Sequence, residues 1–211
     1  MKFSLKILES ESQIQKSILE ALLPSSKKFM NASISKIKAE LPYVVYTAIA
    51  SRPEYNSLIS GQLRLEFGIP DAGMRVSSII DSWISNIVYQ YNEPAIVGKK
   101  IKSSFSAELI KVDFADVLGM PEANVVDAVN NYSLPWLKWL LLDGSAIIVK
   151  KHEVFFGPNI RSRTGGAIMK SSNSSWRVPS EYAGTISNNW ITRAIEDAST
   201  DIEKLLEKAF L

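Results

Sequence analysis

Apolar residues recur at spacings of three and four along much of the N-terminal part of the chain, a period that predicts helices. One stripe lies in the range 29–50 and is interrupted by Pro42, where we expect the helix to bend or divide. A second stripe predicts an amphipathic helix over 74–91, with Asp71 just upstream as its N-cap. The first part of the chain is therefore expected to be helical.

The period changes to two further along the chain. Strict alternation of apolar and polar residues over 101–109 predicts a strand with one solvated face. The apolar run 134–142 predicts a buried helix with Pro135 in its first turn. Two short β-like runs follow, at 146–149 and 154–156.

The most regular helical stripe lies at the end of the chain, over 189–210. Ser187 or Asn188 is expected to cap this helix. Together these elements predict an α+β fold with an N-terminal helical part, a small antiparallel β-sheet and a long C-terminal helix packed on the sheet.

Two regions are expected, with a boundary near residue 92. Residues 1–92 form the helical N-terminal region, and residues 93–211 form an α+β region that contains a basic loop at 157–180. We expect the two regions to fold as one cooperative unit rather than independently.

Composition narrows the function classes. The chain has 211 residues, of which 46% are hydrophobic and 22% are charged, which is typical of a globular protein. It contains no Cys and one His, so disulfides, Cys-ligated metals and His-rich metal sites are excluded, and no cofactor is expected. The start of the chain is charged too early for a signal peptide, and the longest apolar run, 134–142, is too short to span a membrane, which needs about 20 residues. No membrane partner is expected.

No motif points to catalysis. The single histidine, His152, lies in a β-like run where a solvent-facing strand residue is the simplest interpretation. Carboxylate pairs such as Glu108 with Asp113, or Glu66 with Asp71, occur by chance in any chain with 22 acidic residues. Since the nucleophile-elbow and phosphate-loop spacings are also absent, we expect the protein not to be an enzyme.

One charge feature stands out. Residues 150–177 contain six Lys or Arg and one Glu, whereas the stretch from 187 onward has an excess of acidic residues. A basic, Ser- and Gly-rich segment can bind phosphates, meet an acidic neighbouring subunit, or remain a solvated loop.

Several segments of the chain have a recognisable sequence: 134–144, 162–165, 176–179, 183–185 and 188–194 in the C-terminal third and, in the N-terminal half, 58–70. The C-terminal segments resemble virion structural proteins of tailed bacteriophages, of the neck or tail-completion type, which join head to tail or terminate the tail. The N-terminal segment resembles an element of head–tail connector proteins.

The resemblance implies a non-enzymatic protein that assembles as a hexameric ring, completes the tail and joins it to the head connector. Its implied partners are other copies of itself, the neighbouring connector or adaptor proteins and the tail-tube proteins, with DNA in the central channel as a further contact. Its implied location is the virion neck or tail, after assembly in the host cytoplasm. The alternative is a DNA-binding or packaging accessory protein that uses the basic segment 150–177.

Candidate interaction residues follow from the charge pattern and from the preference of interfaces for aromatic residues. Arg161 and Arg163 are expected to contact acidic residues of an adjacent subunit or ring, or else channel DNA. Trp190 lies on the apolar stripe of the last helix and is expected in the core instead. The candidate interaction residues are Arg161, Arg163, Lys170, Trp176, Arg177 and Tyr182.

Overall fold

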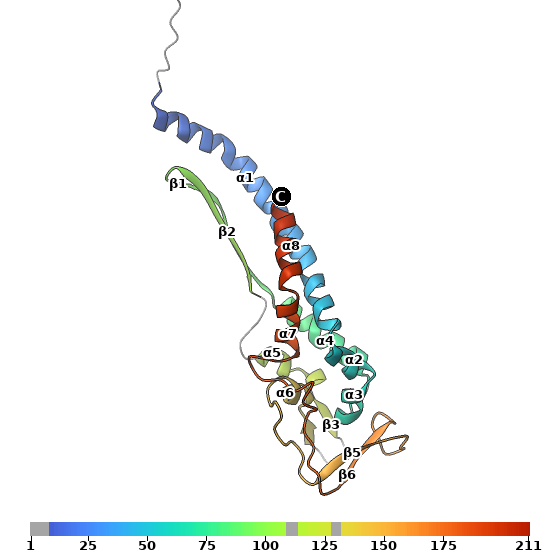
Figure 1. Ribbon diagram of the computed structural model, residues 1–211. Coiled ribbons are helices and arrows are strands. Elements are labelled where there is room, and N and C mark those ends of the chain that lie inside the picture. The colour runs from blue at the N-terminus through green and yellow to red at the C-terminus, as the bar shows by residue number, and fades with distance from the viewer. Residues whose placement is uncertain (1–8, 109–113, 128–131) are drawn as a thin grey trace, which may run out of the picture. The chain divides into compact units, whose positions relative to one another are not determined.

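A computed structural model describes residues 9–108, 114–127 and 132–211 and shows a mixed α+β protein, which confirms the predicted fold class (Figure 1). Within these residues the strands form three separate two-stranded antiparallel sheets instead of one small sheet. Each sheet pairs two strands that are consecutive in the chain. Leu109 and Asp113, which belong to a predicted strand and a candidate carboxylate pair, lie outside the described residues.

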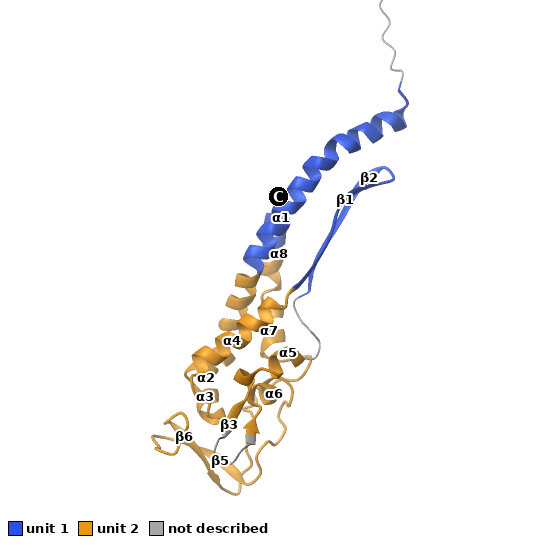
Figure 2. Ribbon diagram, turned by 180° about the vertical axis from the view of Figure 1, so that it is seen from behind, with its two compact units in different colours: residues 1–41, 88–108, 204–211 blue, residues 42–87, 109–203 orange. Residues whose placement is uncertain are grey.

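The chain divides into two compact units (Figure 2). Residue 92 lies inside a strand, and the expected regions 1–92 and 93–211 stay a prediction. Cooperative folding of 1–92 with 93–211 stays a prediction. Unit 1 comprises residues 1–41, 88–108 and 204–211, and unit 2 comprises residues 42–87 and 109–203.

Helix α1 (Glu11–Ala50) contains the first predicted stripe and contributes to both units. It does not divide at Pro42, because helical structure continues to Ala50. A proline inside a helix costs about 3 kcal/mol. Leu41 and Val45, on either side of it, are almost completely buried, and each such burial stabilises the fold by about 1.5–3 kcal/mol. Burial of this face therefore offsets the lost backbone hydrogen bond.

A long hairpin is the β-structure of unit 1. Strands β1 (Val88–Val97) and β2 (Lys100–Glu108) pair antiparallel, with a bulge between Asn92 and Ala95. The strand predicted over 101–109 is thus confirmed for its described part. Its partner β1 was missed, because the helical stripe was extended to residue 91.

Helix α1 and the hairpin are joined inside unit 1 by charged side chains. Lys27 Nζ lies 2.9 Å from Glu93 Oε2, and Lys38 Nζ lies 5.3 Å from the centre of the Tyr89 ring. The Tyr89 ring also stacks on Phe105 across the strands, with ring centres 6.3 Å apart. These contacts position the half-buried face of the hairpin.

Three short helices open the compact part of unit 2: α2 (Pro53–Ile59), α3 (Gln62–Phe67) and α4 (Ala72–Ser85). Gly68 ends α3 with a left-handed backbone conformation at φ 63°, which glycine adopts without strain. Asp71 occupies the N-cap position of α4 as predicted, although its side chain makes no capping hydrogen bond there.

Helix α6 confirms the predicted buried helix of the run 134–142. Pro135 stands at its N-cap position, and four of its residues, including Trp136, are buried. A short paired segment precedes it. The elements of this part are α5 (Ala115–Leu118), the 3-10 helix η1 (Pro121–Ala123), β3 (Val125–Asp127), β4 (Tyr132–Leu134) and α6 (Trp136–Leu141).

A third hairpin follows α6. Strands β5 (His152–Phe156) and β6 (Ala167–Ser171) pair antiparallel, which confirms the β-like run at 154–156. The run 146–149 forms no strand, and only Val149 makes an isolated bridge, to Trp176. The segments around Val149 and Trp176 therefore meet as extended loops.

The C-terminal helical stripe forms two helices, α7 (Trp190–Asp197) and α8 (Ser199–Phe210), separated at Ala198. They pack on α1 instead of on a sheet: Trp190 Nε1 donates a hydrogen bond to the carbonyl oxygen of Ile49 at 3.2 Å. The cap is Asn189, one residue later than expected, in a reciprocal capping box with Thr192. Asn189 is fully buried and satisfies two backbone N–H groups, so it is the better cap.

Among the residues described, no helix combines the length and the apolar character needed to cross a membrane.

Candidate functional site

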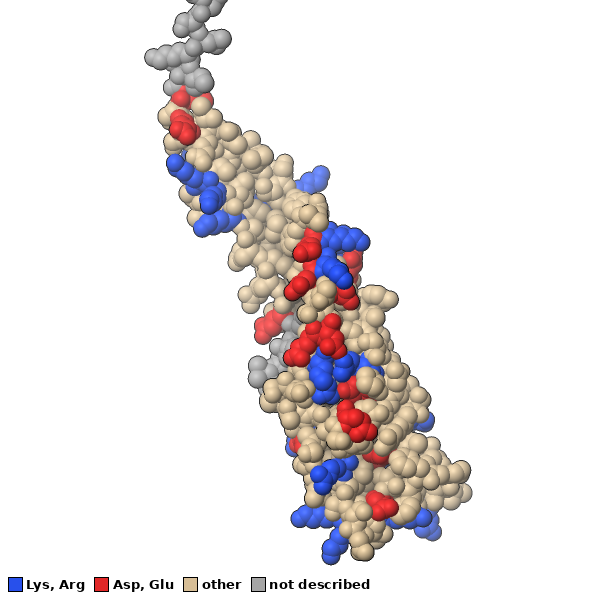
Figure 3. Space-filling model, viewed as in Figure 1, with Lys and Arg blue, Asp and Glu red and all other residues tan. Residues whose placement is uncertain are grey.

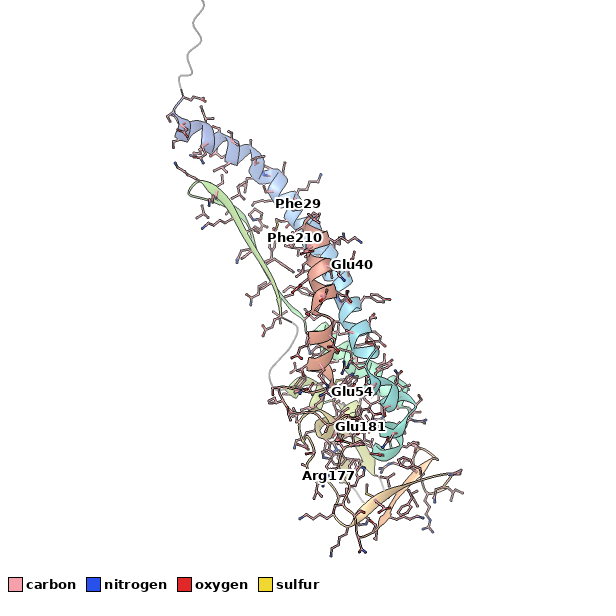
Figure 4. All side chains as sticks on the ribbon, in the orientation of Figure 1. Phe29, Glu40, Glu54, Arg177, Glu181 and Phe210 are labelled. Carbon is pink, nitrogen blue, oxygen red and sulfur yellow. The ribbon has the colours of Figure 1, made fainter. Side chains whose placement is uncertain are left out.

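The basic segment lies at the hairpin end of unit 2. Lys150, Lys151, Arg161 and Lys170 are exposed on or beside β5 and β6, and the space-filling view shows basic side chains at several places on this end of the unit (Figure 3). Arg177 is also exposed, on the loop after β6 (Figure 4). We call the β5–β6 hairpin with its connecting turn, residues 152–171, the basic hairpin.

The turn of the basic hairpin is held by its own hydrogen bonds. The backbone N–H of Gly157 donates to Gly166 O at 2.8 Å, and that of Asn159 donates to Gly165 O at 3.0 Å. The Asn159 Oδ1 atom accepts from the backbone N–H of Arg161 at 2.9 Å. The turn therefore has a defined conformation that presents Ile160 and Arg161 to solvent.

A cleft of about 1090 Å³ lies between the basic hairpin, α3 and β4. Arg161, Arg163 and Lys170 are among its lining residues, and so are apolar side chains such as Leu65. Arg163 has a structural contact as well, because its Nε donates to Gly68 O at 3.3 Å. Among these arginines, Arg161 is thus better placed than Arg163 to meet a partner without disturbing the fold.

Trp176 is buried at the base of this region instead of standing on the surface. Its ring lies 5.7 Å from Phe67 and 6.1 Å from Trp139, both in edge-on arrangements. Its Nε1 donates to Glu66 Oε2 at 3.1 Å. Trp176 therefore supports the basic hairpin from inside. Tyr182 is half-buried in the following loop.

Glu66 lines this cleft, and the pKa of its carboxyl group differs from the ordinary value. Burial raises the pKa of Glu66, and the nearby charge of Glu181 acts in the same direction. Hydrogen bonds from Gln62 Nε2, at 2.6 Å, and from Trp176 Nε1 lower the pKa but do not cancel the effect of burial.

This raised pKa predicts a pH dependence of stability. Above the ordinary value of 4.5, the folded chain holds the Glu66 proton more tightly than the unfolded chain, so the free energy of unfolding should fall as the pH rises through this range. A Glu66→Gln variant keeps a hydrogen-bond acceptor but cannot ionise. Urea unfolding at a series of pH values should show the variant gaining stability over the wild type from acid to neutral pH. A stability difference that is independent of pH would contradict this, and the exposed Glu203→Gln serves as the control.

Within the described part of the chain, the hydrogen-bond partners of His152 are local. Its Nδ1 lies 2.9 Å from Lys150 O, and its Nε2 lies 3.3 Å from the hydroxyl of Ser171, the residue opposite it in the hairpin. Cross-strand pairing explains this contact. Glu66 and Asp71, a candidate carboxylate pair, have different structural roles. Glu66 accepts a hydrogen bond from Trp176, and Asp71 occupies the N-cap position of α4. In the described part of the chain, no group of three acidic or histidine residues could hold a metal ion.

Sequence reasoning missed a second surface of unit 2, a groove of about 440 Å³ between the end of α1, the end of α7 and the start of α8. Small apolar side chains line it, among them Val44, Ala194 and Ala198. Two acidic residues, Asp197 and Asp201, and one basic residue, Arg52, also line it, and Asp197 pairs with Arg52. We call this the acidic groove. Tyr43 could have pointed to this groove from the sequence, because it is an aromatic residue outside the buried stripe of α1. In the structure it is 73% exposed and lines the groove.

Comparison of the chain with protein-family models, with characterised proteins and with solved structures finds no match. The functional interpretation therefore depends on the residues and on the two surfaces described above.

Proposed function

We propose that this chain is a structural protein of the neck or tail end of a tailed bacteriophage, that it assembles as a ring, and that it joins the tail to the head connector. The basic hairpin is the observation that carries the proposal. It exposes Phe155, Phe156 and Ile160 beside Arg161 and Lys170, and exposed apolar side chains with a polar rim are typical of protein-contact surfaces.

The resemblance to virion proteins falls largely on unit 2. The segments 134–144, 162–165 and 176–179 correspond to α6, the turn of the basic hairpin and the loop that contains Trp176. The segments 183–185 and 188–194 lead into and begin α7, and the segment 58–70 contains the end of α2 and all of α3. In the 183–185 segment, Gly184 allows a close approach, because a Cβ at that position would lie 2.6 Å from Leu140 O. These segments thus build the framework that holds the basic hairpin.

The proposal predicts that charge reversal on the basic hairpin blocks particle assembly. Virions made with the Arg161→Glu, Arg163→Glu chain should show separated heads and tails by electron microscopy, because the reversed charges repel an acidic partner. The matched Arg161→Lys, Arg163→Lys chain keeps both charges and should assemble normally. Intact particles with the Glu variant, or cryo-electron microscopy of virions that lack the chain, would contradict the proposal.

A DNA-binding accessory protein is the second candidate, supported by the exposed lysines and arginines of the segment 150–177. Phosphate contacts release counterions, so duplex binding should weaken steeply as the salt concentration rises. Salt-dependent binding of the isolated chain to duplex DNA, lost in the Arg161→Glu, Lys170→Glu variant, would favour this function. The exposed phenylalanines of the hairpin favour a protein partner, because duplex backbones offer little apolar surface.

A further inference from the structure

We propose that the basic hairpin of one copy docks into the acidic groove of the next copy, and that this contact closes the ring. The inference rests on the proposed ring assembly and specifies its interface. The occupant of the groove is thus a second copy of this chain. Both surfaces belong to unit 2, so each subunit carries one of each.

The basic hairpin has the features of an inserting element. Phe155 is 41% exposed, Phe156 is 53% exposed and Ile160 is completely exposed at the turn. Lys170 Nζ lies 5.0 Å from the centre of the Phe155 ring, which holds a positive charge beside the apolar tip. Exposing such side chains is unfavourable in a monomer, and their burial against a partner would stabilise the complex by removing apolar surface from water.

The acidic groove has the features of a receptor. Its lining includes Val44, Ala48 and Ala194, whose small side chains leave an apolar recess open toward larger side chains of a partner. Its volume of about 440 Å³ lies within the range of about 300–1,000 Å³ that is typical of binding pockets. Tyr43 stands 73% exposed beside it, and Tyr is enriched among interface anchors.

The charges of the two surfaces favour the basic hairpin as the segment that binds in the acidic groove. The groove is lined by Asp197, Asp201 and Arg52, and Glu196 is exposed on the same helix as Asp197, so acidic residues outnumber the basic one there. The segment 150–177 carries six Lys or Arg and one Glu. Opposite charges attract each other across an interface, and the acidic residues of the groove would repel the phosphates of a nucleic acid. Asp197 also pairs with Arg52 across the groove lining, so its position is defined before docking.

Two different patches that fit each other generate a head-to-tail contact, which closes into a ring when the rotation between subunits allows it. Such a contact differs from a two-fold symmetric dimer, in which one patch meets itself. The distinction can be tested, because a head-to-tail contact lets two defective chains complement each other.

The absence of cysteine from the chain gives a clean background for crosslinking. We place one cysteine in the hairpin, Phe156→Cys, and one in the groove, Thr47→Cys, an exposed lining residue. Mixing the two chains under mild oxidation should give a disulfide-linked heterodimer, about tenfold more than Phe156→Cys mixed with Met74→Cys, an exposed control position outside both surfaces. A chain with both Phe156→Cys and Thr47→Cys should give a ladder of covalent oligomers. Equal yields from the two mixtures would overturn the proposal.

A complementation experiment tests direction. Phe156→Asp disables the hairpin but leaves the groove, and Thr47→Arg disables the groove but leaves the hairpin. Light scattering should show that neither variant self-associates and that their mixture forms a complex that stops at two chains. A mixture that stays monomeric while the wild type forms oligomers would overturn the proposal.

The failure of this interface and the failure of the virion function are distinguishable. A chain found in a virion ring whose Phe156→Cys, Thr47→Cys variant gives no ladder would overturn the interface alone. A ladder from a chain that is absent from virions would support the interface and overturn the proposed function.

Discussion

Replacing Glu54 with alanine is expected to lower the free energy of unfolding by about 1.5–3 kcal/mol, because it removes the buried carboxylate that pairs with the half-buried side chains of Arg193 and Arg52. The Glu54 side chain is 1% exposed and lies at the start of α2 (Figure 4). Its Oε1 accepts a hydrogen bond from Arg193 Nη2 at 2.6 Å, and its Oε2 lies 3.6 Å from Arg52 Nε. Urea unfolding followed by circular dichroism measures the loss.

A surface ion pair provides the matched control. Lys16 and Glu20 form an exposed pair on α1, and such pairs contribute about 0–1 kcal/mol. Glu20→Ala should therefore unfold close to the wild-type midpoint. If Glu54→Ala loses no more stability than Glu20→Ala, the ion pairs of Glu54 with Arg52 and Arg193 do not stabilise the fold as expected.

The second large effect is expected at Trp190, where substitution with alanine should cost about 3–5 kcal/mol. The side chain is 1% exposed, as the sequence stripe predicted, and its Nε1 bonds to Ile49 O at the end of α1. Removing the indole leaves a cavity between α7 and α1 and also removes one of the two hydrogen bonds that Ile49 O accepts. Thermal and urea unfolding should both show the loss.

Two further variants separate the contributions at this position. Trp190→Phe keeps most of the packing but loses the hydrogen-bond donor, so it should cost about 1 kcal/mol from the hydrogen bond alone. Met74→Ala, at a position 72% exposed, should change stability by about 0.5 kcal/mol or less. A Trp190→Ala chain as stable as Met74→Ala would contradict the packing role of this residue.

Local patterns predicted elements where burial follows a regular period. The stripe of α1, the buried helix α6 and the alternation of β2 all appear in the structure, because each encodes which face avoids water. The final stripe was also correctly identified as helical, although the backbone divides at Ala198 into α7 and α8. Such a break leaves the apolar stripe unchanged and is therefore invisible to periodicity.

Non-local pairing explains the main miss in secondary structure. Ile87 and Val88 continue the helical stripe in sequence, but Val88 begins β1 and pairs with Glu108. The alternation that includes Tyr89 and Tyr91 can be recognised as a strand only when its pairing with β2 is known. A strand whose hydrogen bonds are all made with another segment gives a weaker local signal than a helix, which bonds within itself.

In the candidate site too, some features follow from residues that are close in the chain, and others follow only from contacts between distant segments. Charge composition located the basic segment, because lysine and arginine keep their charge in any fold. The preference of interfaces for aromatic residues placed Trp176 among the candidate interaction residues, and the structure buries that ring against Phe67 and Trp139. Nothing near Trp176 in the chain indicates those partners.

The sequence alone determined the helical stripes, the basic segment, the acidic end of the chain and the absence of cysteine chemistry. Only the tertiary structure decided that Tyr43 and Asp197 line one groove, and that the basic segment forms a hairpin with exposed phenylalanines. The physical reason is that periodicity and charge are properties of neighbouring residues. Which surfaces come together depends instead on contacts between segments far apart in the chain.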